Sequence, residues 1–492
     1  MRRFLLSAVF FIFCMQAFPQ NLTDIVLSEN GSFPSFVLGT TGNIYIVYIN
    51  GQYLYFRGFS AAGAPFGYAR AVASCFTGVI QSTTMTGRSG KMLAAWNTSN
   101  PMIFQWAIKG GLLSGARDTI LAVNQIFSGS SAFQPKITFL NDTLLAAVWT
   151  GIGSGAANYG IYGRTFSPNM EMKSDVTAIS DITDPKAECG SPVLTARPDG
   201  SGFWVFWKDD RSGTPKVYGR AVSKECVPQG SSFLVSEDNL LKSLWFIDAA
   251  TDKDGNTAVI WGAELGNSVY QVQLRYFDKD GKPLGSSVNV TSREGGVGSD
   301  PTVSVAFDSL GNSVAAWDQE EGSKGLRIYA QRYSADRQPV GTPFALSLEK
   351  DSVSQFSPIL KLMNGAIYCV WTETRPGKIS KIKAAILDFS NPILQVSGVR
   401  DNKIIKDFSL NQNYPNPFNP VTTIKYSMLS RAFVELKVFD MLGREAATLV
   451  SKEQDGGEYE VRFDASKLPS GAYVYTIHAG EFRQSKKLLL MK

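Results

Sequence analysis

The sequence predicts an all-β fold, and three features carry that prediction. Hydrophobic residues make up 44% of the 492 residues and charged residues 18%, a balance typical of folded rather than disordered chains. The chain is also rich in aromatic residues and contains 45 glycines, as expected of many short strands joined by tight turns. A unit of roughly 50 residues recurs seven times. We therefore expect a seven-bladed β-propeller followed by a small β-sandwich.

The N-terminal segment has the pattern of a secretory signal peptide. Two arginines precede an apolar run at residues 4–13, and the small residue Ala17 follows. We expect cleavage after Ala17, so that residues 1–17 are removed and the remainder is exported. The apolar run is too short to span a bilayer comfortably and no later segment replaces it, so we expect no integral membrane anchor.

The repeats share one order of elements. Each has a strand led by proline or serine, a turn, and an apolar strand that ends in an aromatic anchor; a polar loop and a further strand follow. In one clear copy Pro301 leads the first strand, Gly311 and Asn312 form the turn, and Trp317 is the anchor. The seven anchors are Tyr48, Trp96, Trp149, Trp207, Trp261, Trp317 and Trp371.

The anchor strands are apolar on both faces, which decides how the repeats assemble. Residues 258–261 and 368–371 lack the alternating polar residues of a strand that faces water on one side. Both faces must therefore be covered, as in four-stranded blades stacked around an axis. An array of β-sandwich domains is the alternative, although its units usually run to about 100 residues. We expect the propeller to occupy residues 18–390.

Closing the ring sets a further expectation. Residues 25–27 form an apolar stretch before the first repeat and have no earlier blade to join. Paired with residues 381–387, they would supply the outer strand of the blade that contains Trp371 and leave no open backbone edge there. Residues 393–396 are the competing candidate for the same place.

After residue 390 the repeat pattern stops. We expect residues 391–406 to form a linker and residues 407–492 a separate domain. Apolar and polar residues alternate in segments such as 434–439 and 472–477, which predicts a small β-sandwich.

Four segments of this final region carry distinctive motifs. They read FSLNQNYPNPFNP at 408–420, VFDMLGRE at 438–445, LPSGAY at 468–473 and KLLLMK at 487–492. Together they resemble the type A sorting domain of the type IX secretion system, over the whole of residues 407–492. The resemblance implies an Ig-like sandwich, the type IX secretion machinery as a partner, and passage through the periplasm and outer membrane to a secreted or cell-surface location. Its motif residues are Asn413, Pro415, Pro417, Phe418, Pro420, Gly443 and Gly471.

The chemistry of these motif residues also suits a structural role within the domain. Pro415, Pro417 and Pro420 lack backbone donors, so their extended segment can fasten across a sheet edge without joining it as a strand. Gly443 suits a turn that needs positive φ, and we expect the same of Gly471.

Export makes disulfides possible among the cysteines that remain after cleavage. These are Cys75, Cys189, Cys226 and Cys369. Cys189 and Cys226 fall in the same repeat and are the best candidate pair. Cys369 lies two residues before Trp371 in an apolar strand, where we expect a buried free thiol.

Residues for several kinds of chemistry are absent. The only histidine, His478, lies in the final domain, which excludes a histidine triad or a histidine zinc site in the repeats. The net charge is only +5 and no basic stripe occurs, so we expect no nucleic-acid partner. Residues 252–256 and 278–281 resemble calcium loops but lack the glutamate at the twelfth position. We expect them to form hairpin turns and expect no cofactor, with calcium as the alternative.

The loops after the anchors are the best candidates for a binding surface. Strand direction alternates, so these loops and the connections between blades emerge on one face of the ring, where functional loops of a rigid scaffold commonly gather. Acidic residues and two arginines crowd them: Asp209, Asp210, Arg211, Glu264, Asp318, Glu320, Glu373 and Arg375. We call these eight residues the candidate ligand face; a solvated rim is the alternative.

We expect these features to make an exported, non-catalytic module that binds a glycan, polymer or protein outside the cell. The alternative is a surface glycoside hydrolase of sialidase-like type, a class with an arginine cluster that grips a carboxylate. Two facing carboxylates could then act as acid and base. Every repeat lacks the Ser-x-Asp-x-Gly-x-x-Trp sequence typical of that family, and nothing singles out a carboxylate pair.

Overall fold

The computed structural model describes residues 23–39, 42–60, 63–66, 68–74, 79–88, 91–100, 105–114, 119–129, 132–152, 158–182, 187–237, 243–264, 270–291, 301–320, 325–347, 353–375, 377, 380–388, 409–428, 432–454, 457–479 and 482–491. Every helix or strand within these residues is a β-strand. The chain forms two compact units, residues 1–396 and 397–492. The expected signal peptide at 1–17, the expected linker at 391–406 and Cys75 lie outside the described residues.

The first unit consists of antiparallel four-stranded sheets, seven of them within the described residues. Each sheet takes its strands in chain order, except the last, whose fourth strand is β1. The strands are β2 (Ser32–Leu38), β3 (Ile44–Asn50), β4 (Tyr53–Phe59), β5 (Arg70–Ser74); β6 (Val79–Arg88), β7 (Lys91–Asn100), β8 (Gln105–Ser114), β9 (Thr119–Gly129); β10 (Ala132–Asn141), β11 (Leu144–Gly151), β12 (Gly160–Phe166), β13 (Thr177–Ala178); β14 (Cys189–Ala196), β15 (Gly202–Asp209), β16 (Lys216–Ser223), β17 (Pro228–Leu234); β18 (Ser243–Thr251), β19 (Thr257–Glu264), β20 (Tyr270–Phe277), β21 (Val288–Asn289); β22 (Val303–Phe307), β23 (Ser313–Glu320), β24 (Leu326–Tyr333), β25 (Pro339–Ala345); and β26 (Ser354–Met363), β27 (Ala366–Thr374), β28 (Lys381–Asp388) with β1 (Thr23–Ser28).

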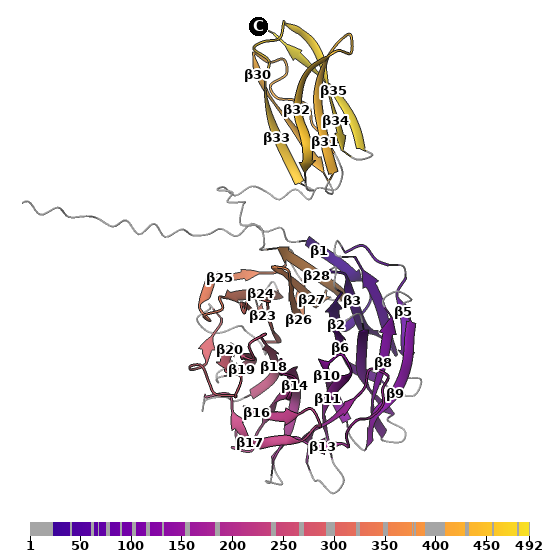
Figure 1. Ribbon diagram of the computed structural model, residues 1–492, viewed down its shortest axis with the longest axis vertical. Helices are drawn as coiled ribbons and strands as arrows, with labels where there is room; N and C mark the ends of the chain where they lie inside the picture. Colours follow the sequence, from indigo (N-terminus) through magenta and orange to yellow (C-terminus); the bar gives the residue numbers. More distant parts are fainter. Residues whose placement is uncertain are drawn as a thin grey trace, which may run out of the picture. The chain divides into compact units, whose positions relative to one another are not determined.

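These sheets succeed one another around a ring (Figure 1). The first strands β2, β6, β10, β14, β18, β22 and β26 each contact the first strand of the next sheet, and β26 contacts β2. We call them the inner strands. The arrangement is propeller-like, with the inner strands around the axis.

The aromatic anchors lie on the second strands and are core residues. The six anchor tryptophans are no more than 1% exposed and Tyr48 is 4% exposed. They pack between neighbouring sheets: Trp149 shares a core cluster with Leu93 of β7, and Trp317 shares one with Ile260 of β19. The repeated aromatic therefore joins one sheet to the next.

The residues before four of the leading prolines shape the start of their repeats. Phe33, Gln134, Ser191 and Ser357 have φ between 50° and 58°. Each lies at a register shift in an inner strand. The proline that follows has no N–H to lose from the ladder, and the bulge bends the strand as it enters the sheet.

The ring closes through the N-terminal strand, as predicted. β1 pairs antiparallel with β28, with Ile25 opposite Ala384 and Val26 opposite Lys383. Figure 1 shows β1 beside β28. The competing residues 393–396 lie outside the described residues. One sheet thus combines strands from both ends of the unit, which pairs backbone groups that would otherwise face an open edge.

The second unit has two antiparallel sheets around one core. One sheet contains β29 (Ser409–Leu410), β30 (Val421–Met428) and β33 (Gly457–Asp464). The other contains β32 (Glu445–Gln454), β31 (Ala432–Asp440), β34 (Gly471–Ala479) and β35 (Phe482–Leu490). Both contribute to the core, Tyr426 and Phe463 from the first sheet and Leu436 and Tyr475 from the second. The two sheets therefore pack face to face.

Candidate functional site

Five residues of the candidate ligand face lie within strands, which corrects the expectation that all eight lie in loops. Asp209 and Glu264 end β15 and β19, Asp318 and Glu320 lie in β23, and Glu373 lies in β27. These second strands continue past their tryptophan anchors. Alternation along a strand, and not loop geometry, therefore decides where each of these side chains points.

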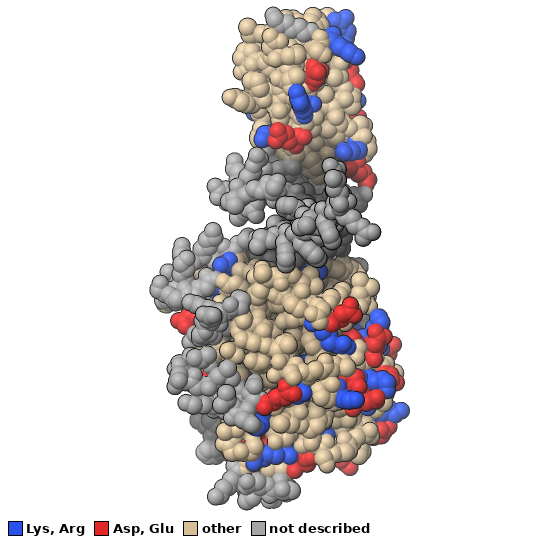
Figure 2. Space-filling view, turned by 90° about the vertical axis from the view of Figure 1, so that its left-hand side faces the viewer, with Lys and Arg blue, Asp and Glu red and all other residues tan. Residues whose placement is uncertain are grey.

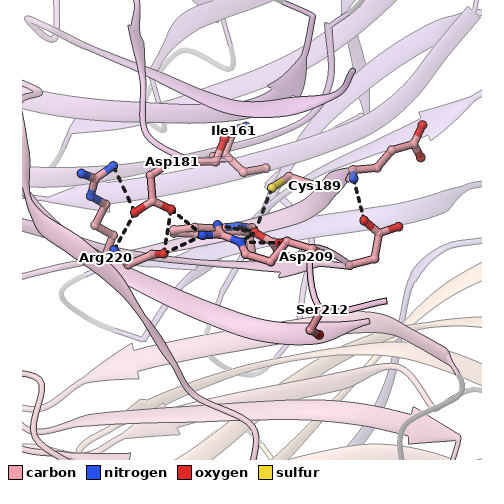
Figure 3. Close-up of polar contacts among 12 residues, drawn as sticks. Ile161, Asp181, Cys189, Asp209, Ser212 and Arg220 are labelled. Atoms are coloured by element: carbon pink, nitrogen blue, oxygen red, sulfur yellow. Dashed lines mark hydrogen bonds and ion pairs between the residues drawn. The ribbon is translucent and has the colours of Figure 1, made fainter. Parts of the chain in front are cut away.

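Asp209 and Arg211 form the centre of a polar cluster with Asp181 (Figure 3). Nε of Arg211 donates to Asp209 Oδ1 at 3.0 Å and Oδ2 at 2.9 Å, and Nη1 donates to Asp181 Oδ1 at 2.8 Å. The guanidinium also lies over the Tyr218 ring, 4.5 Å from its centroid. Asp209 is fully buried and accepts a hydrogen bond of 3.0 Å from the Trp207 indole N–H.

Asp181 connects two sheets through this cluster. It follows β13 of one sheet, whereas Arg211 and Ser232 belong to the next. Ser232 donates to Asp181 from its N–H at 2.8 Å and from its hydroxyl at 2.7 Å. Burial raises the pKa of Asp181, but hydrogen bonds from Ser232 and Arg211 outweigh it and lower this pKa to about 2. Sequence reasoning missed Asp181 because it lies in a connection between sheets and follows no anchor.

Asp318 is buried with neutral partners. The Thr302 N–H donates to its Oδ1 at 2.9 Å and the Thr302 hydroxyl donates to its Oδ2. That hydroxyl accepts a hydrogen bond of 2.7 Å from the Ser357 N–H in the next sheet. Burial raises the pKa of Asp318 to about 7, although the hydrogen bonds from Thr302 lower it. The carboxyl therefore bridges two sheets without a matching cation among the described residues.

Glu373 is also paired inside the protein. Its Oε2 lies 3.2 Å from Lys383 Nζ, and the two side chains are 2% and 5% exposed. Gln355 Nε2 donates to the same oxygen at 3.5 Å. Since both charges are satisfied within the closing sheet, Glu373 does not face a ligand.

The other five residues of the candidate ligand face are nearer the surface. Arg211 is half-buried in the cluster described above, with 23% of its side chain exposed. Asp210 Oδ1 accepts from a backbone N–H at 2.6 Å, and Glu264 Oε2 accepts from a serine hydroxyl at 3.0 Å. Glu320 is half-buried and Arg375 is exposed. Asp210, Glu264, Glu320 and Arg375 follow or end strands of four different sheets, so the eight residues do not form one cluster.

The hairpin turns at the opposite ends of the strands carry charges of both signs. The turns at residues 252–256 and 278–281 are closed by hydrogen bonds to their own first aspartates. Each bears an exposed lysine–aspartate pair. Figure 2 shows acidic and basic side chains intermixed on the side of this unit that it presents. Within the described residues no group of three or more His, Cys, Asp or Glu could hold a metal ion.

The expected Cys189–Cys226 disulfide is wrong, because both thiols are free and buried. Cys189 begins the inner strand β14 and its Sγ lies 3.4 Å from Asp209 Oδ2. Cys226 lies in the turn between the third and outer strands of the sheet. Burial raises the pKa of Cys226 to about 11. Cys369 is the buried free thiol that the sequence predicts.

In the second unit the proline-rich segment connects the two sheets. Tyr414 forms an isolated bridge with β30, and buried Phe418 forms one with the edge strand β35. Pro415 and Pro417, which lie between these bridges, are exposed. The segment thus crosses from one sheet to the edge of the other without becoming a strand of either.

The remaining motif residues hold this segment and the turns of the unit. Asn413 is buried, and its N–H donates to the Tyr475 hydroxyl at 2.9 Å. Pro420 is half-buried at the start of β30. Gly443 has φ +78°, the left-handed conformation predicted for its turn, whereas Gly471 has φ +158° and is nearly extended.

Comparison with solved structures finds similar chains at low sequence identity. An α-L-arabinofuranosidase of Fusarium graminearum complexed with arabinobiose is 9% identical, with a TM-score of 0.44 over 75% of this chain and 98% of that chain. The β-propeller domain of the trilobed protease from Pyrococcus furiosus is 8% identical, with a TM-score of 0.43 over 75% and 99%. At these sequence identities and TM-scores, the activities of these proteins say nothing about the activity of this chain. No curated protein matches the chain in sequence.

The final region matches a family model described as the secretion system C-terminal sorting domain, over residues 412–491. This match confirms the resemblance to the type IX sorting domain and implies interaction with the type IX secretion machinery. In the part of the chain that the structure describes, no helix is long and apolar enough to span a membrane. Residues 412–491 therefore belong to the secretion-system C-terminal sorting domains, and the protein that carries them is exported to the cell surface or secreted.

Proposed function

We propose that the protein is an exported, non-catalytic module that binds a glycan outside the cell. In this proposal residues 1–17 are a signal peptide, 18–390 a seven-bladed β-propeller, 391–406 a linker and 407–492 an Ig-like sorting domain. The ring of four-stranded sheets closed by β1 supports the propeller, and the two sheets around one core support the sandwich. A non-carbohydrate polymer or a protein is the other ligand class.

Exposed aromatic side chains on one face of the ring carry this proposal. Phe33 is 51% exposed, Phe246 42% and Tyr53 41%. They lie near the starts of the first strands β2 and β18 and of the third strand β4. In antiparallel sheets first and third strands start on the same face, where the second strands and their anchors end. Exposed aromatic rings on a rigid scaffold mark a binding surface, and their flat faces suit stacking against sugar rings.

The buried carboxylates favour binding over hydrolysis. A glycosidase of the usual kind needs two carboxyl groups that face the substrate, about 5 to 9.5 Å apart. Asp209, Asp318 and Glu373 are instead buried and paired within the protein. Three of the six candidate carboxylates are therefore not free to act on a substrate, which favours ligand binding over hydrolysis at this face.

A glycan array combined with a polysaccharide hydrolysis assay tests the proposal. We expect saturable binding without turnover, weakened about tenfold or more in Phe33→Ser and Tyr53→Ser, as for aromatic hot spots. Tyr68→Ser is the matched control, because Tyr68 is 90% exposed and lies in the connection after β4, where the strand has reached the opposite face. Turnover of a glycan would replace the proposal by a hydrolase. An equal loss in Tyr68→Ser would refute the assignment of the face.

Deleting residues 407–492 tests the sorting part separately. The two units have separate cores, so we expect the first unit to fold without the second and to remain in the periplasm. Cell fractionation and a thermal melt of the truncated chain measure both outcomes. Appearance of the truncated chain outside the cell at the normal level would contradict the assigned role.

A further inference from the structure

Two inner strands carry a lysine inside the ring. Lys136 of β10 and Lys361 of β26 are exposed, although Ile137 and Leu360 beside them are buried. An inner strand is bounded outward by the second strand of its own sheet and sideways by the inner strands of two neighbouring sheets. A side chain in the paired part of such a strand, beyond the bulge near its start, meets water along the axis, around which Figure 1 shows the inner strands.

Charged groups from three sheets that are not neighbours share this axis. Burial lowers the pKa of Lys361, while Asp248 raises it and Lys136 lowers it further. Asp248 lies on β18, the inner strand of a third sheet. Because the sheets of β10, β18 and β26 do not adjoin, only the axis brings these side chains close enough to influence one another. Lys361 is thus accessible to water and yet enclosed by protein.

Asp248 does not neutralise both lysines. Its Oδ2 accepts from the Ser304 hydroxyl at 2.8 Å and from the Val305 N–H at 3.0 Å. Ser304 in turn accepts from the Leu360 N–H at 3.1 Å, which fixes the Asp248 carboxylate beside the strand that carries Lys361. Neither lysine forms an ion pair with an acidic residue of the described ranges. Two lysine side chains therefore share the axis with one carboxylate that already accepts two hydrogen bonds.

Enclosed charges are costly unless they are paired, and like charges repel more strongly where water is scarce. We propose that the axis of the ring is a binding site for one singly charged oxyanion group, held by Lys136 and Lys361. With Asp248 in place the three side chains carry one net positive charge. This charge matches a carboxylate or a sulfate ester better than a doubly charged phosphate. The site is independent of the aromatic residues on the face of the ring.

Isothermal titration of the full chain tests the site at constant ionic strength. The probes are acetate, glucuronate and, as the neutral counterpart, glucose. We expect one saturable site for acetate and glucuronate and none on the axis for glucose. Lys361→Met and Lys136→Met should each weaken anion binding about tenfold, the effect of losing one close charge partner. Lys253→Met, which removes an equal charge from an exposed turn, should change affinity less than about twofold.

Asp248→Asn separates a binding effect from a folding defect. Asparagine keeps an oxygen that can accept from Ser304 but removes the negative charge, so anion binding should become about tenfold tighter. A misfolded variant would not gain affinity. Equal affinities for acetate and glucuronate would identify a free anion as the ligand, and tighter glucuronate binding would identify an acidic sugar. Failure of both anions to bind, or wild-type affinity in Lys361→Met, would overturn the site.

Discussion

Two aspartates that follow buried tryptophans lie in opposite environments. Asp209 comes two residues after Trp207, and Asp318 comes one residue after Trp317. Because side chains alternate across a strand, Asp209 shares the face of its tryptophan and Asp318 points to the other face. Asp209 meets an arginine guanidinium, whereas Asp318 meets only the N–H and hydroxyl of a threonine.

This offset of one residue decides how each buried carboxyl is stabilised. Where a cation is present, the carboxylate forms an ion pair, and the same arginine also pairs with Asp181 of the neighbouring sheet. Where only neutral donors are present, the carboxyl keeps its proton up to about neutral pH. Both are buried, so similar acidic sequences after the anchors do not make a common ligand surface.

Removing the anchor tryptophans should have the largest effect on stability, and the effect should be the same for Trp207 and Trp317. Trp207→Ala and Trp317→Ala each create a large cavity in the core, and we expect a loss of about 3–5 kcal/mol in unfolding free energy. Chemical denaturation measures this loss. A change below about 1 kcal/mol would mean that the tryptophans do not support the packing between sheets.

Removing the cation should lower the stability that depends on Asp209 and should not affect Asp318. Arg211→Met keeps much of the packing against Tyr218 but leaves two carboxylates without their partner, and we expect a loss of about 3 kcal/mol. The matched control is Arg88→Met, whose pair with Asp142 is 49% and 60% exposed and should contribute less than about 1 kcal/mol. Equal losses in the two variants would show that the cluster is no stronger than a surface pair.

The contribution of Asp318 to stability should depend on pH. The folded-state pKa of about 7 lies above that of an unfolded aspartate, so this group lowers stability as pH rises from about 4 to 7 and adds nothing below that range. Asp318→Asn resembles the protonated form. It should match the wild type near pH 4 and be more stable by roughly 4 kcal/mol at pH 8.

Denaturation of both proteins across this range gives the difference curve for Asp318. Asp181 has a lowered pKa of about 2, so its own contribution is lost only as pH falls toward that value. A difference curve that stays flat between pH 4 and 8 would contradict the raised pKa of Asp318.

The smallest effect concerns the indole hydrogen bond. The Trp207 N–H donates to Asp209, whereas the Trp261 N–H has no partner within the described structure. Trp207→Phe should therefore cost about 1 kcal/mol more than Trp261→Phe, the usual worth of one hydrogen bond. Thermal melts of the two variants compare them directly, and equal costs would mean that Asp209 is sufficiently held by its arginine.

The sequence was most informative where local pattern decides structure. Repeating anchors predicted the buried second strands, and residues 25–27 predicted the closing strand, because an unpaired strand would expose its backbone groups. It was least informative about the site. Asp181 and Lys361 gave no signal, because their roles depend on residues of other sheets that lie far away in the chain.

By itself the sequence determined an all-β chain, the positions of the repeats, and an exported protein with a C-terminal sorting domain. These follow from patterns that are local: alternation, turn residues, aromatic spacing and short motifs. Only the tertiary structure decided which polar side chains meet. How far each strand runs past its anchor sets the face on which a carboxyl lies, and the ring brings residues from distant repeats onto one axis.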